Sequence, residues 1–180
     1  MQISKMLEDK YILCICEGNA EKDIMNILLE GGLLIFNRED LIEDKVHKRM
    51  SVKKIEDNYL GLSYNKELVI LRIIDSKNEK FRLRKAYRGR FEILTAITNP
   101  EIEILIVIDK GDYDEFCKNK SKEKPSEFCK RVYNYNRIKR KGFMYNYFKE
   151  SKKLIDAIKG HKKHKDNKIL TLFDLIKNKN

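Results

Sequence analysis

The sequence has no tryptophan, only two prolines and eight glycines among its 180 residues, and no long apolar run. So few chain-breaking residues exclude a Pro- or Gly-rich linker and favour a globular chain with its own core. A bilayer-spanning helix needs roughly 18 or more apolar residues in succession, so we predict no membrane-spanning segment. The N-terminus also lacks the apolar core of a signal peptide, and we therefore expect a cytoplasmic protein.

Several motifs that would identify an activity are missing as well. Four cysteines are present, but none forms a C-x-x-C pair, which excludes a zinc ribbon or a thioredoxin-like redox motif. Cys14 and Cys16 lie inside an apolar run, where a thiol behaves as a small hydrophobic residue. No G-x-x-x-x-G-K-[ST] loop occurs, so an ATPase, if one is involved, must be a separate chain.

The positive charge is concentrated in the last third of the chain. The whole chain carries a formal net charge of +11, and Phe116 to Lys168 holds 18 Lys and Arg against 5 Asp and Glu, or 18 − 5 = +13. The rest therefore has 11 − 13 = −2. The basic character belongs to the C-terminal part, and the acidic residues of the front part are available for another role.

Short apolar runs in the front two-thirds predict an α/β fold. Runs of this length between charged segments are typical of strands, and we place strands at residues 11–16, 33–36, 68–74 and 102–108. Residues 1–115 are thus predicted to form a largely parallel four-stranded sheet with flanking helices. Residues 116–180 are predicted to form a basic helical extension that packs on the same domain.

Helix signals lie between these runs. Asn19 is a candidate N-cap for a helix that Gly31-Gly32 ends, and Ser126 is a candidate N-cap further on. Residues 38–58 are charged with sparse apolar positions and are predicted to be helix plus loop, and residues 80–97 are predicted to be helical in part. Apolar residues recur at spacings of three and four in 143–159 and 169–177, which predicts helices there.

Carboxylates follow three of the four predicted strands. Glu17 follows the first, Asp75 the third and Asp109 the fourth, and parallel strands deliver their C-terminal ends to one edge of the sheet. Glu21 and Glu79 lie four residues beyond Glu17 and Asp75, so each can point back to that edge. In contrast, Glu101 and Glu103 precede the predicted fourth strand.

Two interpretations of these acids differ in function. Acids at strand ends and in first helical turns often only cap helices and favour the positive end of the helix dipole. Carboxylates that converge from distant positions instead repel one another unless a cation neutralises them. Oxygen ligands of this kind suit Mg²⁺ or Mn²⁺. Glu101 and Glu103 precede the predicted fourth strand, so we expect them at the opposite edge of the sheet and assign them a structural role, not a catalytic one.

The segment "CICEGNAEKDIMNILL" resembles the first motif of the Toprim fold, in which a glutamate and a glycine follow the first strand. Topoisomerases, primases, OLD-family nucleases and several phage-defence nucleases share that fold. Its second motif is Asp-x-Asp, often with a glutamate four positions after the first Asp. "RIIDSKNEKF" supplies Asp75 and Glu79 at that spacing but has Lys77 where the other aspartate is expected. A second alignment uses "IVIDKGDYDEF", with Asp109, Asp112 and Asp114.

The resemblance, which covers about residues 10–115, implies a Mg²⁺- or Mn²⁺-dependent nuclease-like protein acting on DNA or RNA. It implies catalytic roles for Glu17, Glu21, Asp75 and Glu79, metal ligation by Glu17, Asp75 and Asp109, and a context such as phage defence with a possible partner chain. Lys77 favours an alternative, a catalytically inactive module that binds nucleic acid or a partner. A third possibility is a phosphate-binding protein that uses the glycines at the sheet edge.

The basic segment 130–153 interleaves cations with aromatic rings. Lys and Arg neutralise phosphates, and exposed tyrosines stack on unpaired bases. The candidate nucleic-acid-binding residues are Arg137, Lys139, Arg140, Lys141, Tyr135 and Tyr145. The alternative is a solvated helix face whose aromatic side chains belong to the core.

Overall fold

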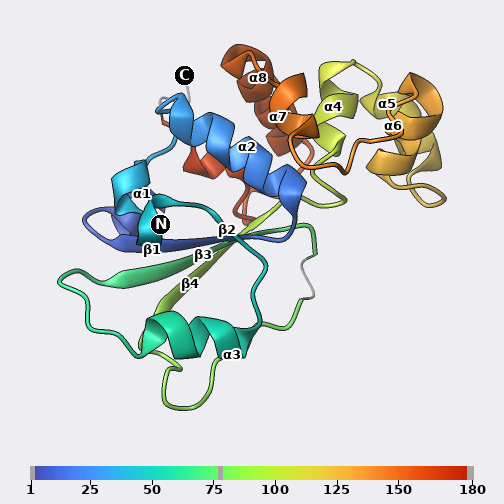
Figure 1. The fold of residues 1–180 in the computed structure, drawn as a ribbon. Coiled ribbons are helices and arrows are strands. Elements are labelled where there is room, and N and C mark those ends of the chain that lie inside the picture. The colour runs from blue at the N-terminus through green and yellow to red at the C-terminus, as the bar shows by residue number, and fades with distance from the viewer. Residues whose placement is uncertain (1–2, 77–78, 178–180) are drawn as a thin grey trace.

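The computed structural model describes residues 3–76 and 79–177, which form an α/β fold around one sheet (Figure 1). The sheet has four strands in the order β2-β1-β3-β4, and every neighbouring pair is parallel. The strands are β1 (Tyr11–Cys16), β2 (His47–Lys48), β3 (Leu68–Ile74) and β4 (Glu92–Ile97). The predicted α/β class with a parallel four-stranded sheet is therefore confirmed.

The two central strands are those that the sequence marks most clearly. The predicted strands at 11–16 and 68–74 are β1 and β3, and every residue of β3 is buried. Central strands of a parallel sheet are covered on both faces, so their sequences are apolar without interruption by polar residues. Arg72 is the one charged residue within β3.

The other two predicted strands are wrong. In segment 33–36, only Leu34 forms a bridge, an isolated antiparallel one with Ile176. Segment 102–108 instead contributes most of helix α4 (Ile104–Asp109), whose first four residues are buried. An apolar run that is surrounded by protein can be a helix or a strand, because periodicity does not separate the two.

The sheet is completed by two segments with weaker sequence signals. The two-residue strand β2 pairs beside β1, and β4 pairs beside β3 in a region predicted to be partly helical. That helical prediction is wrong, because 92–97 is a strand and residues 85–90 form turns. β4 has mixed burial, so its sequence EILTAI alternates only partly between apolar and polar residues.

Side chains of β1 alternate between two hydrophobic clusters. Ile12 and Cys14 belong to the cluster beneath α2 (Asn19–Glu30), whereas Leu13 and Ile15 belong to the cluster beneath α3 (Val52–Ile55). This alternation follows from the two-residue period of a strand. Figure 1 shows α2 and α3 on opposite faces of the sheet.

Four C-terminal helices pack on the same face of the sheet as α2. They are α5 (Tyr113–Asn119), α6 (Pro125–Tyr133), α7 (Phe143–Tyr147) and α8 (Ser151–Lys163). Phe128, Met144 and Leu154 from this part belong to the same cluster as Ile12 of β1. The boundary predicted at residues 115 and 116 falls within α5. The shorter helical elements are α1 (Ile3–Leu7), η1 (Arg38–Asp40), η2 (Ile42–Asp44), η3 (Glu56–Leu60) and η4 (Leu172–Leu175).

Both predicted helix caps are displaced from their expected residues. Helix α2 has Gly18 as its N-cap, so Asn19 is the first helical residue. Helix α6 has Lys124 as its N-cap, so Ser126 lies inside the helix.

Candidate functional site

The C-terminal ends of β1 and β3 bring Glu17 and Asp75 together. The Glu17 backbone N–H donates to the Ile73 carbonyl at 2.9 Å, which continues the sheet pairing by one residue. The Glu17 Oε2 atom accepts a hydrogen bond from the Asp75 backbone N–H, also at 2.9 Å. The predicted meeting of these two residues at one sheet edge, across 58 positions of sequence, is confirmed.

Glu17 and Asp75 line an acidic pocket of about 280 Å³. We use this name for the pocket whose charged lining residues are Glu17, Glu21, Asp75, Glu101, Glu103 and Lys139. Loops after β1, β3 and β4, the first turn of α2 and the segment after α6 supply these residues. The pocket therefore lies at the C-terminal edge of the parallel sheet, where α/β proteins commonly bind ligands.

Gly18 explains how Glu21 reaches this pocket. The Glu21 Oε2 atom accepts a hydrogen bond from the Gly18 backbone N–H at 3.0 Å, one turn back along α2. A Cβ atom on Gly18 would lie 3.1 Å from this oxygen, so a residue without a side chain gives Glu21 room. The side chain is buried, and burial, with the nearby charges of Glu103 and Glu17, raises the pKa of Glu21 to about 7.

Asp75 shows the same effect. Burial raises the pKa of Asp75 to about 6, and the charge of Glu17 and a hydrogen bond with its side chain add to the rise. At neutral pH the acidic pocket therefore holds carboxyl groups that gain from binding either protons or a cation.

Glu101 and Glu103 were assigned to the opposite edge of the sheet, and the structure corrects this. Because 104–109 is a helix, the two residues follow β4 and line the acidic pocket. Both are only 4% exposed. Burial raises the pKa of Glu103, and the charge of Glu101 adds to the rise. The sequence signal that was available is the Glu-Ile-Glu triplet directly after Asn99-Pro100.

Lys139 is exposed, as predicted, but it also lines the acidic pocket. Its Nζ lies 2.8 Å from Glu101 Oε1, and the Ser126 backbone N–H donates to Glu101 Oε2 at 3.2 Å. Burial alone would raise the pKa of Glu101, but the hydrogen bonds from Lys139 and Ser126 outweigh it and lower that pKa. The protein itself thus places one cation among these carboxylates.

The donor chemistry of the acidic pocket fits a hard divalent cation, because its oxygen ligands are carboxylates with raised pKa values. The geometry is not that of a formed metal site. Within residues 3–76 and 79–177, no group of three or more His, Cys, Asp or Glu side chains is arranged to hold an ion. Protein donors engage Glu17, Glu21 and Glu101 instead, through Asp75, Gly18 and Lys139.

Asp109 does not line the acidic pocket, and its expected place at the end of a strand is wrong. It is the last residue of α4, where the Tyr147 hydroxyl donates to its Oδ2 and Lys153 Nζ lies 3.1 Å from the same oxygen. Asp112, from the alternative second motif, does not line the acidic pocket either, and it accepts a hydrogen bond from the Tyr133 hydroxyl at 2.6 Å. Lys77 lies outside the described residues.

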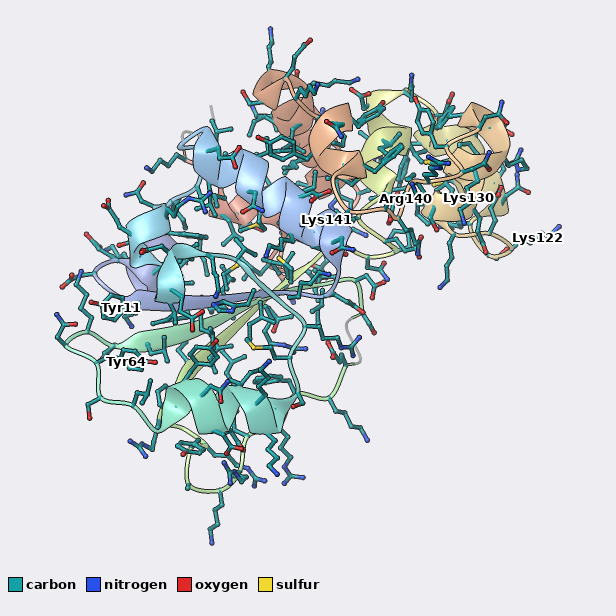
Figure 2. All side chains as sticks on the ribbon, viewed as in Figure 1. Tyr11, Tyr64, Lys122, Lys130, Arg140 and Lys141 are labelled. Carbon is teal, nitrogen blue, oxygen red and sulfur yellow. The ribbon has the colours of Figure 1, made fainter. Side chains whose placement is uncertain are left out.

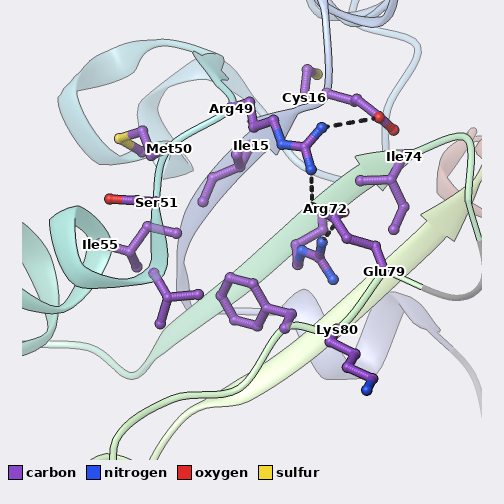
Figure 3. A pocket seen from close by; sticks show the side chains of 13 residues that line it. Ile15, Cys16, Arg49, Met50, Ser51, Ile55, Arg72, Ile74, Glu79 and Lys80 are labelled. Carbon is purple, nitrogen blue, oxygen red and sulfur yellow. Dashed lines mark hydrogen bonds and ion pairs between the residues drawn. The ribbon is translucent and has the colours of Figure 1, made fainter.

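Glu79 lies in a second pocket, of about 210 Å³, on the α3 side of the sheet (Figure 3). Arg49 Nη2 donates to Glu79 Oε1 at 2.6 Å, and Arg72 Nη2 donates to Glu79 Oε2 at 2.5 Å. Arg49 Nη1 also lies 3.3 Å from Glu17 Oε1. Glu17 lines both pockets, so the two are neighbours at the sheet edge. No motif or spacing in the sequence pointed to Arg49.

The predicted nucleic-acid-binding residues fall into two groups. Arg137, Arg140 and Lys141 are exposed. Figure 2 shows Arg140 and Lys141 in one row with Lys130 and Lys122 across the C-terminal helices. Such a row suits the phosphate backbone of a nucleic acid.

The tyrosines are less available than predicted. Tyr135 is half-buried and packs against Tyr133, Phe143 and Tyr147, with ring centroids 5.5–6.0 Å apart. Tyr145 is 38% exposed, and its hydroxyl donates to Glu30. Tyr135 therefore serves the core, as the alternative interpretation expected, and only Tyr145 presents a substantial exposed surface.

A scan against protein-family models and searches of curated proteins and solved structures return no match for this chain. The described part of the chain also contains no helix that is long and apolar enough to cross a membrane.

Proposed function

We propose that this chain is a Toprim-like, Mg²⁺-dependent protein that hydrolyses phosphodiester bonds in nucleic acid. The observation that supports the proposal is the acidic pocket, where carboxylates from the ends of β1, β3 and β4 and from α2 converge. Carboxyl groups whose pKa values are raised by burial and by one another's charge are stabilised as carboxylates by a divalent cation, and Mn²⁺ would serve as well as Mg²⁺.

In this proposal Glu17 and Asp75 are the principal ligands, because they sit at adjacent strand ends and already contact each other. Glu21, Glu101 and Glu103 complete the negative charge of the pocket. A bound divalent cation would act as a Lewis acid on a phosphate oxygen. Ligation requires carboxylate oxygens that are now bonded to protein donors, so a side-chain rearrangement accompanies loading.

Lys139 has a role in either state of the pocket. Its ammonium lies at 2.8 Å from Glu101 in this structure and lowers the pKa of that carboxyl group. With the acids neutralised by a cation, the Lys139 ammonium would be free to contact a phosphate oxygen of the strand. Its neighbours Arg140 and Lys141 continue the positive charge onto the outer surface.

Cleavage of single-stranded DNA, duplex DNA and RNA should be measured with Mg²⁺, with Mn²⁺ and with EDTA. We expect metal-dependent cleavage of at least one substrate, with loss in both Glu17→Gln and Asp75→Asn. Glu39→Gln is the matched control, because Glu39 is exposed and remote from the pocket lining. Activity that persists in both pocket variants would rule out the assignment.

A second function is favoured by one observation. Lys139 already occupies the acidic pocket as a cation, and the described residues contain no preformed metal group. This arrangement also suits a catalytically inactive module that binds nucleic acid or a partner chain through its basic surface. Binding that is unaffected by EDTA, together with no cleavage of any substrate, would favour this function over the enzyme.

A further inference from the structure

The second pocket contains two arginines that hold one carboxylate between them (Figure 3). Arg49 directly follows β2, and Arg72 is the fifth residue of β3. The parallel sheet therefore brings both guanidinium groups to the same edge as Glu17. Each arginine takes a different oxygen of Glu79, so the carboxylate bridges them.

Arg72 is buried to an unusual degree for a charged residue. It is 6% exposed, lies on the central strand β3, and its guanidinium carbon is 4.4 Å from the centroid of the Phe81 ring. Replacing a buried ion pair by apolar residues of similar volume is often neutral or stabilising, because desolvation offsets the attraction. Stability of the fold is therefore only a weak reason for an arginine at this position, although removing one partner of the pair would be destabilising.

Glu79 is in contrast partly exposed to solvent. Its side chain retains 25% exposure, and its two oxygens match the two guanidinium groups as the oxygens of a phosphate would. Arginine binds carboxylate and phosphate with the same planar fork of donors. A phosphate group can thus take the place of the carboxylate between the two guanidinium groups, with Glu79 turned to solvent.

We propose that Arg49 and Arg72 form a phosphate-binding site that Glu79 occupies in this structure, and that a phosphate group of a nucleic-acid strand binds there by displacing Glu79. The choice of a strand as the ligand rests on the proposed function, but the site itself requires no metal. Arg49 contacts Glu17 at 3.3 Å, so a phosphate held here lies directly beside the acidic pocket.

The competition between Glu79 and phosphate gives the proposal its test. Binding of inorganic phosphate, a 5′-phosphorylated oligonucleotide and the same oligonucleotide without that phosphate should be measured by calorimetry in EDTA. Glu79→Gln removes the competing charge and should tighten phosphate binding by roughly tenfold, the size expected for one charge-assisted hydrogen bond. Arg49→Gln should weaken it by a similar factor.

Matched controls separate local effects from net charge. Arg82→Gln and Glu39→Gln change the net charge equally at exposed positions that do not line the second pocket, and they should leave the affinity within about twofold. Thermal unfolding of each variant shows that it is folded. Arg72 is left intact, because removing one partner of a buried ion pair is strongly destabilising.

Opposite effects of Glu79→Gln and Arg49→Gln support the site. Equal affinities in wild type and both variants, or weaker binding in Glu79→Gln, overturn it. If Glu79→Gln and Arg49→Gln shift the affinity for inorganic phosphate but leave the affinity for both oligonucleotides unchanged, the choice of a strand as the ligand is overturned. All these measurements are made without metal, so absence of cleavage refutes the enzyme alone and leaves this result standing.

Discussion

Replacing Glu21 with glutamine should stabilise the protein, and the gain should grow with pH. Glu21 is 7% exposed and sits among other carboxylates, so the folded protein favours its protonated form. Glutamine keeps an oxygen that can accept the hydrogen bond from the Gly18 N–H. The substitution thus removes the ionisable group while retaining the cap of α2.

The size of the effect follows from the pKa of Glu21, which rises from 4.5 to about 7. The folded protein binds this proton more tightly than the unfolded chain, so the free energy of unfolding falls as pH rises from about 4.5 to about 7. At about 1.4 kcal/mol per pKa unit, the ionised glutamate costs about 3 kcal/mol near pH 8. Near pH 5 the cost is only about 1 kcal/mol, because the folded carboxyl group still holds its proton.

Urea denaturation near pH 5 and near pH 8, in EDTA, measures this difference. Glu21→Gln should exceed wild type by about 1 kcal/mol at the lower pH and by about 3 kcal/mol at the higher. Glu39→Gln, an exposed control, should show the same small difference from wild type at both. An equal gain at the two pH values, or a loss near pH 8, would refute the reasoning from burial.

Three further predictions concern other parts of the molecule. Lys139→Gln should lower the melting temperature by more near pH 8 than near pH 3, because Glu101 loses a cation that lowers its pKa, and that contribution fades only as pH falls through the lowered pKa. Near pH 8, Mg²⁺ should restore part of the loss if the acidic pocket binds it. An equal loss at both pH values would contradict that assignment. The exposed residues Arg137, Arg140 and Lys141 form the outer basic surface. Replacing all three with Gln should weaken nucleic-acid binding for all sequences and flatten its salt dependence, as measured by fluorescence anisotropy. An unchanged salt slope would show that this surface is only solvated. Gly160→Ala should destabilise the fold by about 1–3 kcal/mol in urea denaturation, because a Cβ there would lie 2.6 Å from Ile108 Cγ2 where α8 packs on α4. No loss relative to Lys152→Ala, at an exposed position of α8, would show that the two helices adjust.

Local sequence was sufficient for the first half of the acidic pocket. The runs 11–16 and 68–74 are apolar, short and ended by an acid, so β1, β3, Glu17 and Asp75 could be placed correctly. Glu21 followed from helical spacing after Glu17. These features are local, because a central strand and the residue after it are read from a few neighbouring side chains.

Only the tertiary structure placed the other acids of the pocket, Glu101 and Glu103. The run ILIVID has the composition of a strand, yet EILTAI at 92–97 pairs beside β3 and ILIVID becomes helix α4. Which segment pairs with β3 depends on contacts between residues far apart in the sequence, and composition and periodicity do not reveal it. The pairing of β4 with β3 moves Glu101 and Glu103 to the edge that holds Glu17.

Long-range packing also determined which charges meet. The bonds of Lys139 with Glu101, and of Arg49 with Glu17 and Glu79, join residues that are 30 or more positions apart. Sequence alone determined the central strands and the acids directly after them, because short-range patterns specify both. Only the folded chain decided which cations neutralise those acids, because that depends on strand order and on how the C-terminal helices pack.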